Sequence, residues 1–320
     1  MSKIKCVAGG VLALLLVATG AVAQQFPSKA VTVVLPAGPG GVAEMFMSAI
    51  APEVSKRLGQ PVVADHRPGA GGLLGIEVGL RAVPDGHTLI FANDSMLGTP
   101  NFVKTKFDPE KDLAPIAIYS RAPHVLVVNG KLGVTSLKAF VDYAKANPGK
   151  LNAAVLPNTI PYLQTLRFMQ LSGMKAQSIP YPANPPVITA LLADTVDFTL
   201  TSSISTYIEH IKTGRLRVLA VGSAEPFATF PDVPTFRQAG YDFESVAWQG
   251  IFAPAAVPQA AVARLSAEII AAAQMPSVVE KIRAQGFEPW LLHGDPLKEV
   301  IARAIRNGRE TARQAGIQPQ

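Results

Sequence analysis

The sequence predicts an α/β protein of two lobes, each organised around a doubly wound, mainly parallel sheet. Three observations predict this fold class. Short apolar and β-branched runs alternate with helical stretches, the alternation occurs twice along the chain, and no low-complexity linker separates the two rounds. Alternating strands and helices are typical of parallel sheets whose faces are covered by helices.

The first round of the alternation lies in the first hundred residues. Strands are expected at residues 30–35, 60–65 and 88–92, and helices at 43–58 and 71–83. The first of these strands, AVTVVL, is apolar or β-branched nearly throughout, which is typical of a strand buried on both faces. The β-α-β-α-β order therefore predicts a parallel sheet.

The second round repeats the pattern further along the chain. Its expected strands are at residues 125–128, 151–155, 196–200 and 216–221, and its expected helices are at 136–146, 161–172, 187–193 and 204–213. A strand at 248–254 and three amphipathic helices at 259–273, 276–285 and 296–315 complete the chain.

The chain is expected to cross between the two units twice, near residues 121–127 and 245–252. The predicted lobes are residues 24–123 plus 249–320 and residues 124–248. A double crossing of this kind makes a hinged pair of lobes with a cleft that closes around a ligand.

The N-terminus reads as a secretory signal peptide over residues 1–23. Lys3 and Lys5 precede an apolar run at residues 7–17, and small residues then lead to a cleavage site near Ala23. The alternative is an uncleaved membrane anchor, but the run is short for a span of about 20 residues. Cys6, the only cysteine, lies in this segment, so the mature chain has no thiol for catalysis or for a metal site.

Charge gives no sign of a nucleic-acid partner. The formal net charge is +6, and removal of the two lysines of the signal leaves +4. The cations are scattered, except for a group on the last expected helix, where a solvated face is the usual interpretation. That group is Arg303, Arg306, Arg309 and Arg313.

Four loops at the carboxyl ends of expected strands are candidates for binding a small molecule. Ligands of parallel α/β sheets bind at these ends, beside helix N-termini that favour anions. The candidate residues are Ala37, Gly38, Gly40, Gly41, Val42, Ala43 and Glu44 in the first loop, Asn93 and Ser95 in the second, Pro157, Asn158, Thr159 and Tyr162 in the third, and Thr201 and Ser202 in the fourth. Taken singly, each loop is also explained as a turn or a helix cap.

A dinucleotide site is the alternative interpretation of the first loop. Gly38-Pro39-Gly40-Gly41-Val42-Ala43 fits the pattern G-x-G-x-x-A after a strand, and Asp65 ends the next strand where a ribose-binding acid belongs. This would make the chain an oxidoreductase. Export by a signal without twin arginines argues against it, and other catalytic motifs are absent from the sequence, so no enzyme, cofactor or metal site is expected.

Ordered motifs over residues 26–317 resemble a known family. They include LGQPVV at 58–63, RPGAGG at 67–72, PDGHTL at 84–89, NPGKL at 147–151, PDVPT at 231–235 and WQGIFAP at 248–254. The chain resembles the extracytoplasmic solute receptors of tripartite tricarboxylate transporters, the Bordetella uptake gene family. The resemblance implies a periplasmic, monomeric, two-lobed binding protein of the type II-like fold that delivers a small organic carboxylate to membrane permease subunits.

The pocket loops depart from the family pattern. Glu44 replaces the usual aspartate, the loop at 155–159 has lost its Gly-x-Gly-Thr, and Tyr181-Pro182-Ala183 replaces Tyr-Lys-Gly. Such receptors hold a carboxylate mainly through backbone N–H groups and waters, which agrees with the lack of Arg and Lys in these loops. We expect Tyr181 to line the pocket. Four residues are expected to add apolar surface near the cleft, namely Met45, Leu156, Ile160 and Tyr162. We expect this apolar set to favour a carboxylate with a hydrophobic or aromatic body over citrate or an amino acid.

Overall fold

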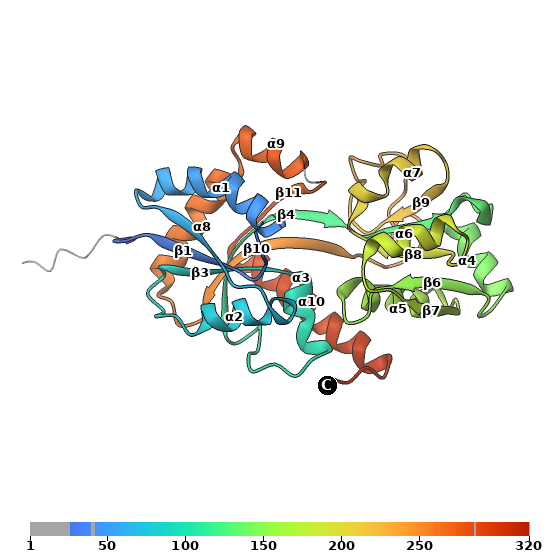
Figure 1. Ribbon diagram of the computed structural model, residues 1–320, viewed down its shortest axis with the longest axis horizontal. Coiled ribbons are helices and arrows are strands. Elements are labelled where there is room, and N and C mark those ends of the chain that lie inside the picture. Colours follow the sequence, from blue (N-terminus) through green and yellow to red (C-terminus); the bar gives the residue numbers. More distant parts are fainter. Residues whose placement is uncertain (1–25, 40–41, 285, 320) are drawn as a thin grey trace, which may run out of the picture.

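Two β-sheets, each covered by helices on both faces, lie side by side in the chain (Figure 1). The computed structural model describes residues 26–39, 42–284 and 286–319. The expected signal peptide and its cleavage site at residues 1–23, as well as Gly40 and Gly41, lie outside the described residues.

The larger sheet has six strands in the order β11-β4-β10-β3-β1-β2. Its strands are β1 (Val31–Leu35), β2 (Val62–His66), β3 (Thr88–Asn93), β4 (Leu113–Pro123), β10 (Val246–Pro254) and β11 (Glu288–Leu292). β1 pairs in parallel with β2 and β3, whereas β10 pairs antiparallel with β3 and β4, and β11 pairs antiparallel with β4. Four of the six strands, β1 to β4, therefore run in one direction, which confirms the mainly parallel sheet.

Two separate cores cover the two faces of this sheet. The helices are α1 (Val42–Leu58), α8 (Gln259–Ala273) and α9 (Pro276–Ala284) on one face, and α2 (Leu73–Leu80), α3 (Asp94–Gly98) and α10 (Gly294–Gln314) on the other. Alternate residues of β3 divide between them: Leu89 and Phe91 pack under α1, while Ile90 and Ala92 pack with Leu97 of α3. We call these the α1 face and the α10 face.

The smaller sheet has five strands in the order β7-β6-β8-β5-β9. Its strands are β5 (Val125–Asn129), β6 (Leu151–Val155), β7 (Ala176–Pro180), β8 (Phe198–Thr201) and β9 (Leu216–Val221), and its helices are α4 (Leu137–Ala146), α5 (Ile160–Ser172), α6 (Asn184–Leu192) and α7 (Ile208–Lys212). β6 is parallel to β7 and β8, and β5 alone runs against its neighbours. The second α/β unit is therefore also mainly parallel.

Three chain segments form the hinge between the sheets. β4 continues through His124 into β5, and the chain returns from Gly222, just after β9, by way of Ser245 into β10. The N–H of His124 donates to Ser245 O at 2.9 Å, that of Gly222 to His124 O at 2.8 Å, and that of Ser245 to Gly222 O at 2.8 Å. β10 begins at Val246 in the larger sheet, three residues before the predicted lobe boundary, and the lobe limits stay a prediction.

The lobes also touch on both sides of the hinge. On one side α5 packs against α10, and Phe102, Leu163 and Ala312 form a small shared core. On the other side the N–H of Ala228 donates to Glu288 Oε1 at 3.3 Å. The hinge strands therefore run between two interlobe contacts.

Several elements were absent from the sequence prediction. β4, β7, β11 and α3 were not expected, and the helix expected at 204–213 is a short 3₁₀ turn, Ile204–Thr206, followed by α7. Pro115 and Pro289 interrupt the apolar runs of β4 and β11, and proline is unusual inside strands. Among the described residues no single helix meets the length and hydropathy needed to span a membrane, although the bent pair α8 and α9 meets them together.

Candidate functional site

The loops that follow β3 and β6 meet at the lobe interface. α3 follows β3 and contacts α5, which follows β6. The contact is tight, because a Cβ added to Gly98 of α3 would lie 2.3 Å from Ile160 Cδ1 of α5. Two of the four predicted loops are therefore brought together across the cleft.

The first loop is held by the end of β2. His66 Nδ1 donates to Ala37 O at 3.0 Å, and His66 Nε2 lies 3.5 Å from Glu44 Oε1. Ala43 is 4 % exposed, so its side chain belongs to the core and only its backbone could reach a ligand. Gly38 has open space around it, and Val42 begins α1. This loop offers backbone groups.

The dinucleotide interpretation of this loop finds no support in the position of Asp65. Its Oδ1 lies 3.0 Å from Arg67 Nε, two residues along the chain. The acid that a ribose would need is thus engaged in a local ion pair.

Helix capping occupies two of the predicted polar side chains, Asn93 and Thr159. Asn93 Oδ1 accepts from the N–H of Met96 at 2.9 Å and caps α3. Thr159 Oγ1 accepts from the N–H of Tyr162 at 3.4 Å and caps α5, where Asn158 has φ +60°. Ser95 and Ser202 are half-buried, and Pro157 is exposed. The capping interpretation is therefore confirmed for the second and third loops, and their ligand role stays a prediction.

In the smaller sheet, the fourth loop carries a network of neutral hydrogen bonds. Thr201 is 4 % exposed, and its Oγ1 accepts from the N–H of Ser203 at 3.1 Å. Ser203 Oγ accepts from Asn184 Nδ2 at 3.1 Å, and Tyr207 Oη donates to Asn184 Oδ1 at 3.4 Å. Burial raises the pKa of Tyr207, so its hydroxyl stays protonated. Tyr181 is half-buried and bonds Val155 O through its N–H at 2.9 Å.

The predicted apolar set is divided. Ile160 and Tyr162 pack with the interlobe core around Phe102, and Leu156 packs with the core of the smaller sheet. Met45 is 40 % exposed in the first turn of α1. Ile160 therefore joins the lobes by its contact with Gly98, and it lines the interlobe pocket on the α10 face that is described below.

Buried polar side chains on the hinge strands form a row that sequence reasoning missed. Gln249 of β10 lies opposite Ser120 of β4 and opposite Asn93 of β3, and cross-strand partners share a face of the sheet. Asn93 follows Phe91 by two residues, which places the row on the α1 face, at the sheet end nearest the other lobe. Tyr119 joins this face beside a β-bulge and packs on Phe46.

We call Tyr119, Ser120 and Gln249 the polar row. They are 1 %, 0 % and 5 % exposed, and Tyr119 Oη, Ser120 Oγ and Gln249 Oε1 have no hydrogen-bond partner among the described residues. Such groups are rare in folded proteins, because an unpaired buried polar atom costs about 1 to 3 kcal/mol. The only signal for them in the sequence is polar side chains within otherwise apolar strands.

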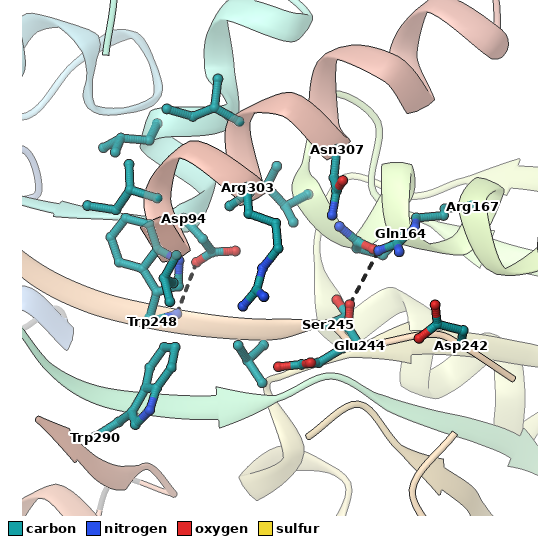
Figure 2. Close-up of a pocket in the computed structure, with 18 of the residues that line it drawn as sticks. Asp94, Gln164, Arg167, Asp242, Glu244, Ser245, Trp248, Trp290, Arg303 and Asn307 are labelled. Atoms are coloured by element: carbon teal, nitrogen blue, oxygen red, sulfur yellow. Dashed lines mark hydrogen bonds between the residues drawn. The ribbon is translucent and has the colours of Figure 1, made fainter. Parts of the chain in front are cut away.

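A pocket of about 250 Å³ opens on the α10 face of the same hinge (Figure 2). Asp94, Trp248, Trp290 and Arg303 line it from the larger sheet and its helices, and Gln164 lines it from α5. Ile160 of the predicted apolar set lines this pocket, whereas none of the other described residues that were predicted for the site does. The polar row and this pocket therefore lie on opposite sides of the hinge strands.

Two buried titratable groups beside the hinge have opposite pKa shifts. Burial raises the pKa of Asp94 to about 7, although the N–H of Trp248 donates to its Oδ1 at 3.4 Å. Burial lowers the pKa of His124 to about 4, while its Nδ1 lies 2.9 Å from Ser245 Oγ. Both groups are therefore held in their neutral forms near pH 6.

These shifts predict opposite pH dependences of stability. Between about pH 4 and 7 the folded chain keeps a proton on Asp94 that the unfolded chain has released. The free energy of unfolding that depends on Asp94 therefore falls as pH rises through this range. The unfolded chain protonates His124 below about 6.5 and the folded chain only below about 4, so this contribution is lost as pH falls through that window. Each is worth up to about 3 to 4 kcal/mol, and together they nearly cancel.

Single substitutions should reveal the two contributions. Relative to the unmodified chain, Asp94→Asn should gain stability between pH 4.5 and 7, and His124→Gln should lose it, by up to about 3 kcal/mol each. Urea unfolding at the two pH values measures the difference. If either variant differed from the unmodified chain by the same free energy of unfolding at both pH values, the pKa shift assigned to that residue would be contradicted.

The comparisons with known proteins agree with this architecture. The profile of the tripartite tricarboxylate transporter family receptors matches residues 46–316. The chain belongs to this family. BugT from Bordetella pertussis is 30 % identical over 321 residues, covering 99 % of this chain and 98 % of that protein. Members of the family are solute receptors, as the motifs of the sequence imply.

Solved structures similar to this receptor are periplasmic binding proteins. Rpa4515 of R. palustris, solved with adipate, is 27 % identical with a TM-score of 0.73, over 92 % of this chain and all of that one. MatC of Rhodopseudomonas palustris, solved with bound malate, is 28 % identical with a TM-score of 0.67, over 90 % and 100 %. A TctC solute-binding protein from Polaromonas, 23 % identical, has a TM-score of 0.83 over 90 % and 99 %, which shows the shared fold. The two-lobed α/β prediction is confirmed.

Proposed function

We propose that this receptor binds a small mono- or dicarboxylate with an apolar body between its lobes, on the α1 face of the hinge, and passes it to the membrane subunits of a tripartite transporter. The receptor would act as a periplasmic monomer without catalysis. Relatives solved with adipate and malate support the ligand class.

The polar row is the observation that carries the proposal. It lies on the face covered by α1, whose first turn and preceding loop offer backbone groups to an anion. The loops at residues 36–44, 156–162 and 201–203 contain no Arg or Lys. A ligand there would be held by neutral donors and acceptors, so hydrogen-bond geometry and not ion pairing would select it.

A thermal-shift screen tests the proposal. A ligand that binds only the folded chain stabilises it by about 2.7 kcal/mol at a hundredfold excess over Kd. We expect adipate and aromatic monocarboxylates to raise the melting temperature more than citrate does. Stabilisation by NAD alone would refute the receptor function, whereas a stronger effect of citrate would refute only the preference for an apolar body.

Replacement of Gln249 by leucine should separate function from stability. Gln249→Leu removes a buried amide whose Oε1 has no hydrogen-bond partner among the described residues, so the free energy of unfolding should rise by about 1 kcal/mol. The same change removes a hydrogen bond to the ligand and should weaken adipate binding about tenfold. Calorimetry and urea unfolding measure the two effects.

The exposed Gln259 at the start of α8 supplies the matched control. Gln259→Leu should change neither quantity. If Gln249→Leu lowers stability and leaves adipate affinity unchanged, the polar row is structural and the ligand lies elsewhere.

A further inference from the structure

The pocket on the α10 face has properties of a binding site distinct from the proposed carboxylate site. It is lined from both sides of the hinge: Asp94, Trp248 and Arg303 come from the larger sheet and its helices, and Gln164 and Glu244 come from the part of the chain that belongs to the other lobe (Figure 2). Its volume is about 250 Å³, far more than the ~15 Å³ of accessible space that a single water needs. That size suits a small molecule.

Most charged groups around this pocket are already engaged. Arg237 lies 3.2 Å from Asp242 and 3.4 Å from Glu244, and Arg167 Nη1 donates to the carbonyl of Glu244 at 3.4 Å. These contacts all lie on the wall contributed by the smaller lobe. On the opposite wall, which the larger lobe contributes, one acid and one base are not part of these contacts: Asp94 and Arg303.

Asp94 is the free acid. It is 9 % exposed, and its Oδ2 has no hydrogen-bond partner among the described residues. Figure 2 shows the carboxylate pointing into the pocket beside the indole of Trp248. A buried carboxyl group whose second oxygen has no partner in the described part of the chain calls for a donor. An ammonium group is the strongest donor available, and its charge also favours the ionised form that burial alone disfavours.

Arg303 is the free base. It is an exposed residue of α10 with its guanidinium directed into the pocket (Figure 2), and none of the ion pairs in the described part of the chain includes it. A guanidinium binds a carboxylate through two parallel hydrogen bonds. The indole of Trp248 adds apolar and π-rich wall beside the acid, which favours a cation there. The ring of Trp290, farther from Asp94, already carries the guanidinium of Arg121 at 5.2 Å from its centroid.

We propose that this pocket is a second binding site, which takes the zwitterion of a small amino acid with its ammonium on Asp94 and its carboxylate on Arg303. Gln164, whose Oε1 is buried and has no partner within the described part of the chain, contacts the ligand from the facing lobe. Because the walls belong to both lobes, occupancy of the pocket favours the conformation in which α5 and α10 are in contact.

Tryptophan fluorescence tests this site directly. The chain contains two tryptophans, and both line the pocket. We expect L-alanine to change the emission in a saturable way, and propionate and propylamine, which each carry one of its two charges, to leave it unchanged at the same concentrations. A response to propionate alone would show an anion site at Arg303 and would overturn the zwitterion.

Variants locate the response. Asp94→Asn and Arg303→Gln should each weaken the alanine response at least tenfold, whereas Arg306→Gln, on the exposed surface of α10, should not. Circular dichroism checks that each variant is folded. No response in the unmodified chain, or a response that survives in both pocket variants, would refute the site.

One more variant separates this site from the proposed function. Gln249→Leu lies on the other face of the hinge and should retain the alanine response while it loses adipate affinity. Loss of both responses in Gln249→Leu would place the two ligands in a single site and contradict the second one. Adipate binding without an alanine response would leave the receptor function intact and refute only the second site.

Discussion

Replacing Gly98 by leucine is expected to weaken adipate binding by about tenfold to a hundredfold. A Cβ at this position would lie 2.3 Å from Ile160 Cδ1 and 2.9 Å from Ile160 Cγ1, so a larger side chain must push α3 and α5 apart. Because α3 and α5 meet on the α10 face of the hinge, their separation changes the relative placement of the lobes on which the site on the α1 face depends. The apparent affinity then falls by the fraction of molecules that keep the binding-competent placement. Calorimetric titration of the variant measures the loss.

Two further variants test whether the effect of Gly98→Leu comes from the size of the added side chain and from its clash with Ile160. Gly98→Ala should cost much less, because the atom it meets is the end of a flexible side chain. Adding Ile160→Ala to Gly98→Leu should restore most of the affinity, because it removes the clashing atoms. Unchanged affinity in Gly98→Leu would mean that ligand binding does not need the contact of α3 with α5.

Gly222→Ala is expected to have the largest effect on stability, about 3 kcal/mol or more. A Cβ there would lie 2.3 Å from Ser245 O and 2.9 Å from His124 O. Both obstacles are backbone atoms of the hinge, which are fixed by the hydrogen bonds that join the three segments. The overpacking therefore cannot be relieved by a change of side-chain rotamer.

Gly38→Ala is the matched control for Gly222→Ala. A Cβ at Gly38 would meet no atom of the described residues within 4 Å, so the free energy of unfolding of Gly38→Ala should change by less than about 0.5 kcal/mol. Urea unfolding compares the two variants. Equal stabilities would show that the hinge segments can separate without cost to the fold.

The sequence predicted the regular part of the fold because its signals are local. The apolar run at β1 and the alternation of strands and helices determine the parallel units. The hinge strand β4 was missed because Pro115 and Pro123 read as breaks, and its pairing with β10 and β11 joins segments more than a hundred residues apart. Pairing over such distances leaves no local pattern.

The candidate site was only partly predictable for the same reason. The capping residues Asn93 and Thr159 were identified, since a polar residue before a helix is a local signal. Gln249 and Ser120 face each other only because of the register between β10 and β4. Asp94 and Arg303 lie more than two hundred positions apart in the sequence, so their common pocket follows from tertiary packing.

Titration of the chain with adipate, followed by calorimetry, tests the central claim most directly. If a small carboxylate binds between the lobes, one adipate should bind per chain, and Gln249→Leu should reduce its affinity about tenfold. No binding of adipate, malate or an aromatic carboxylate, together with saturable binding of NAD, would contradict the account.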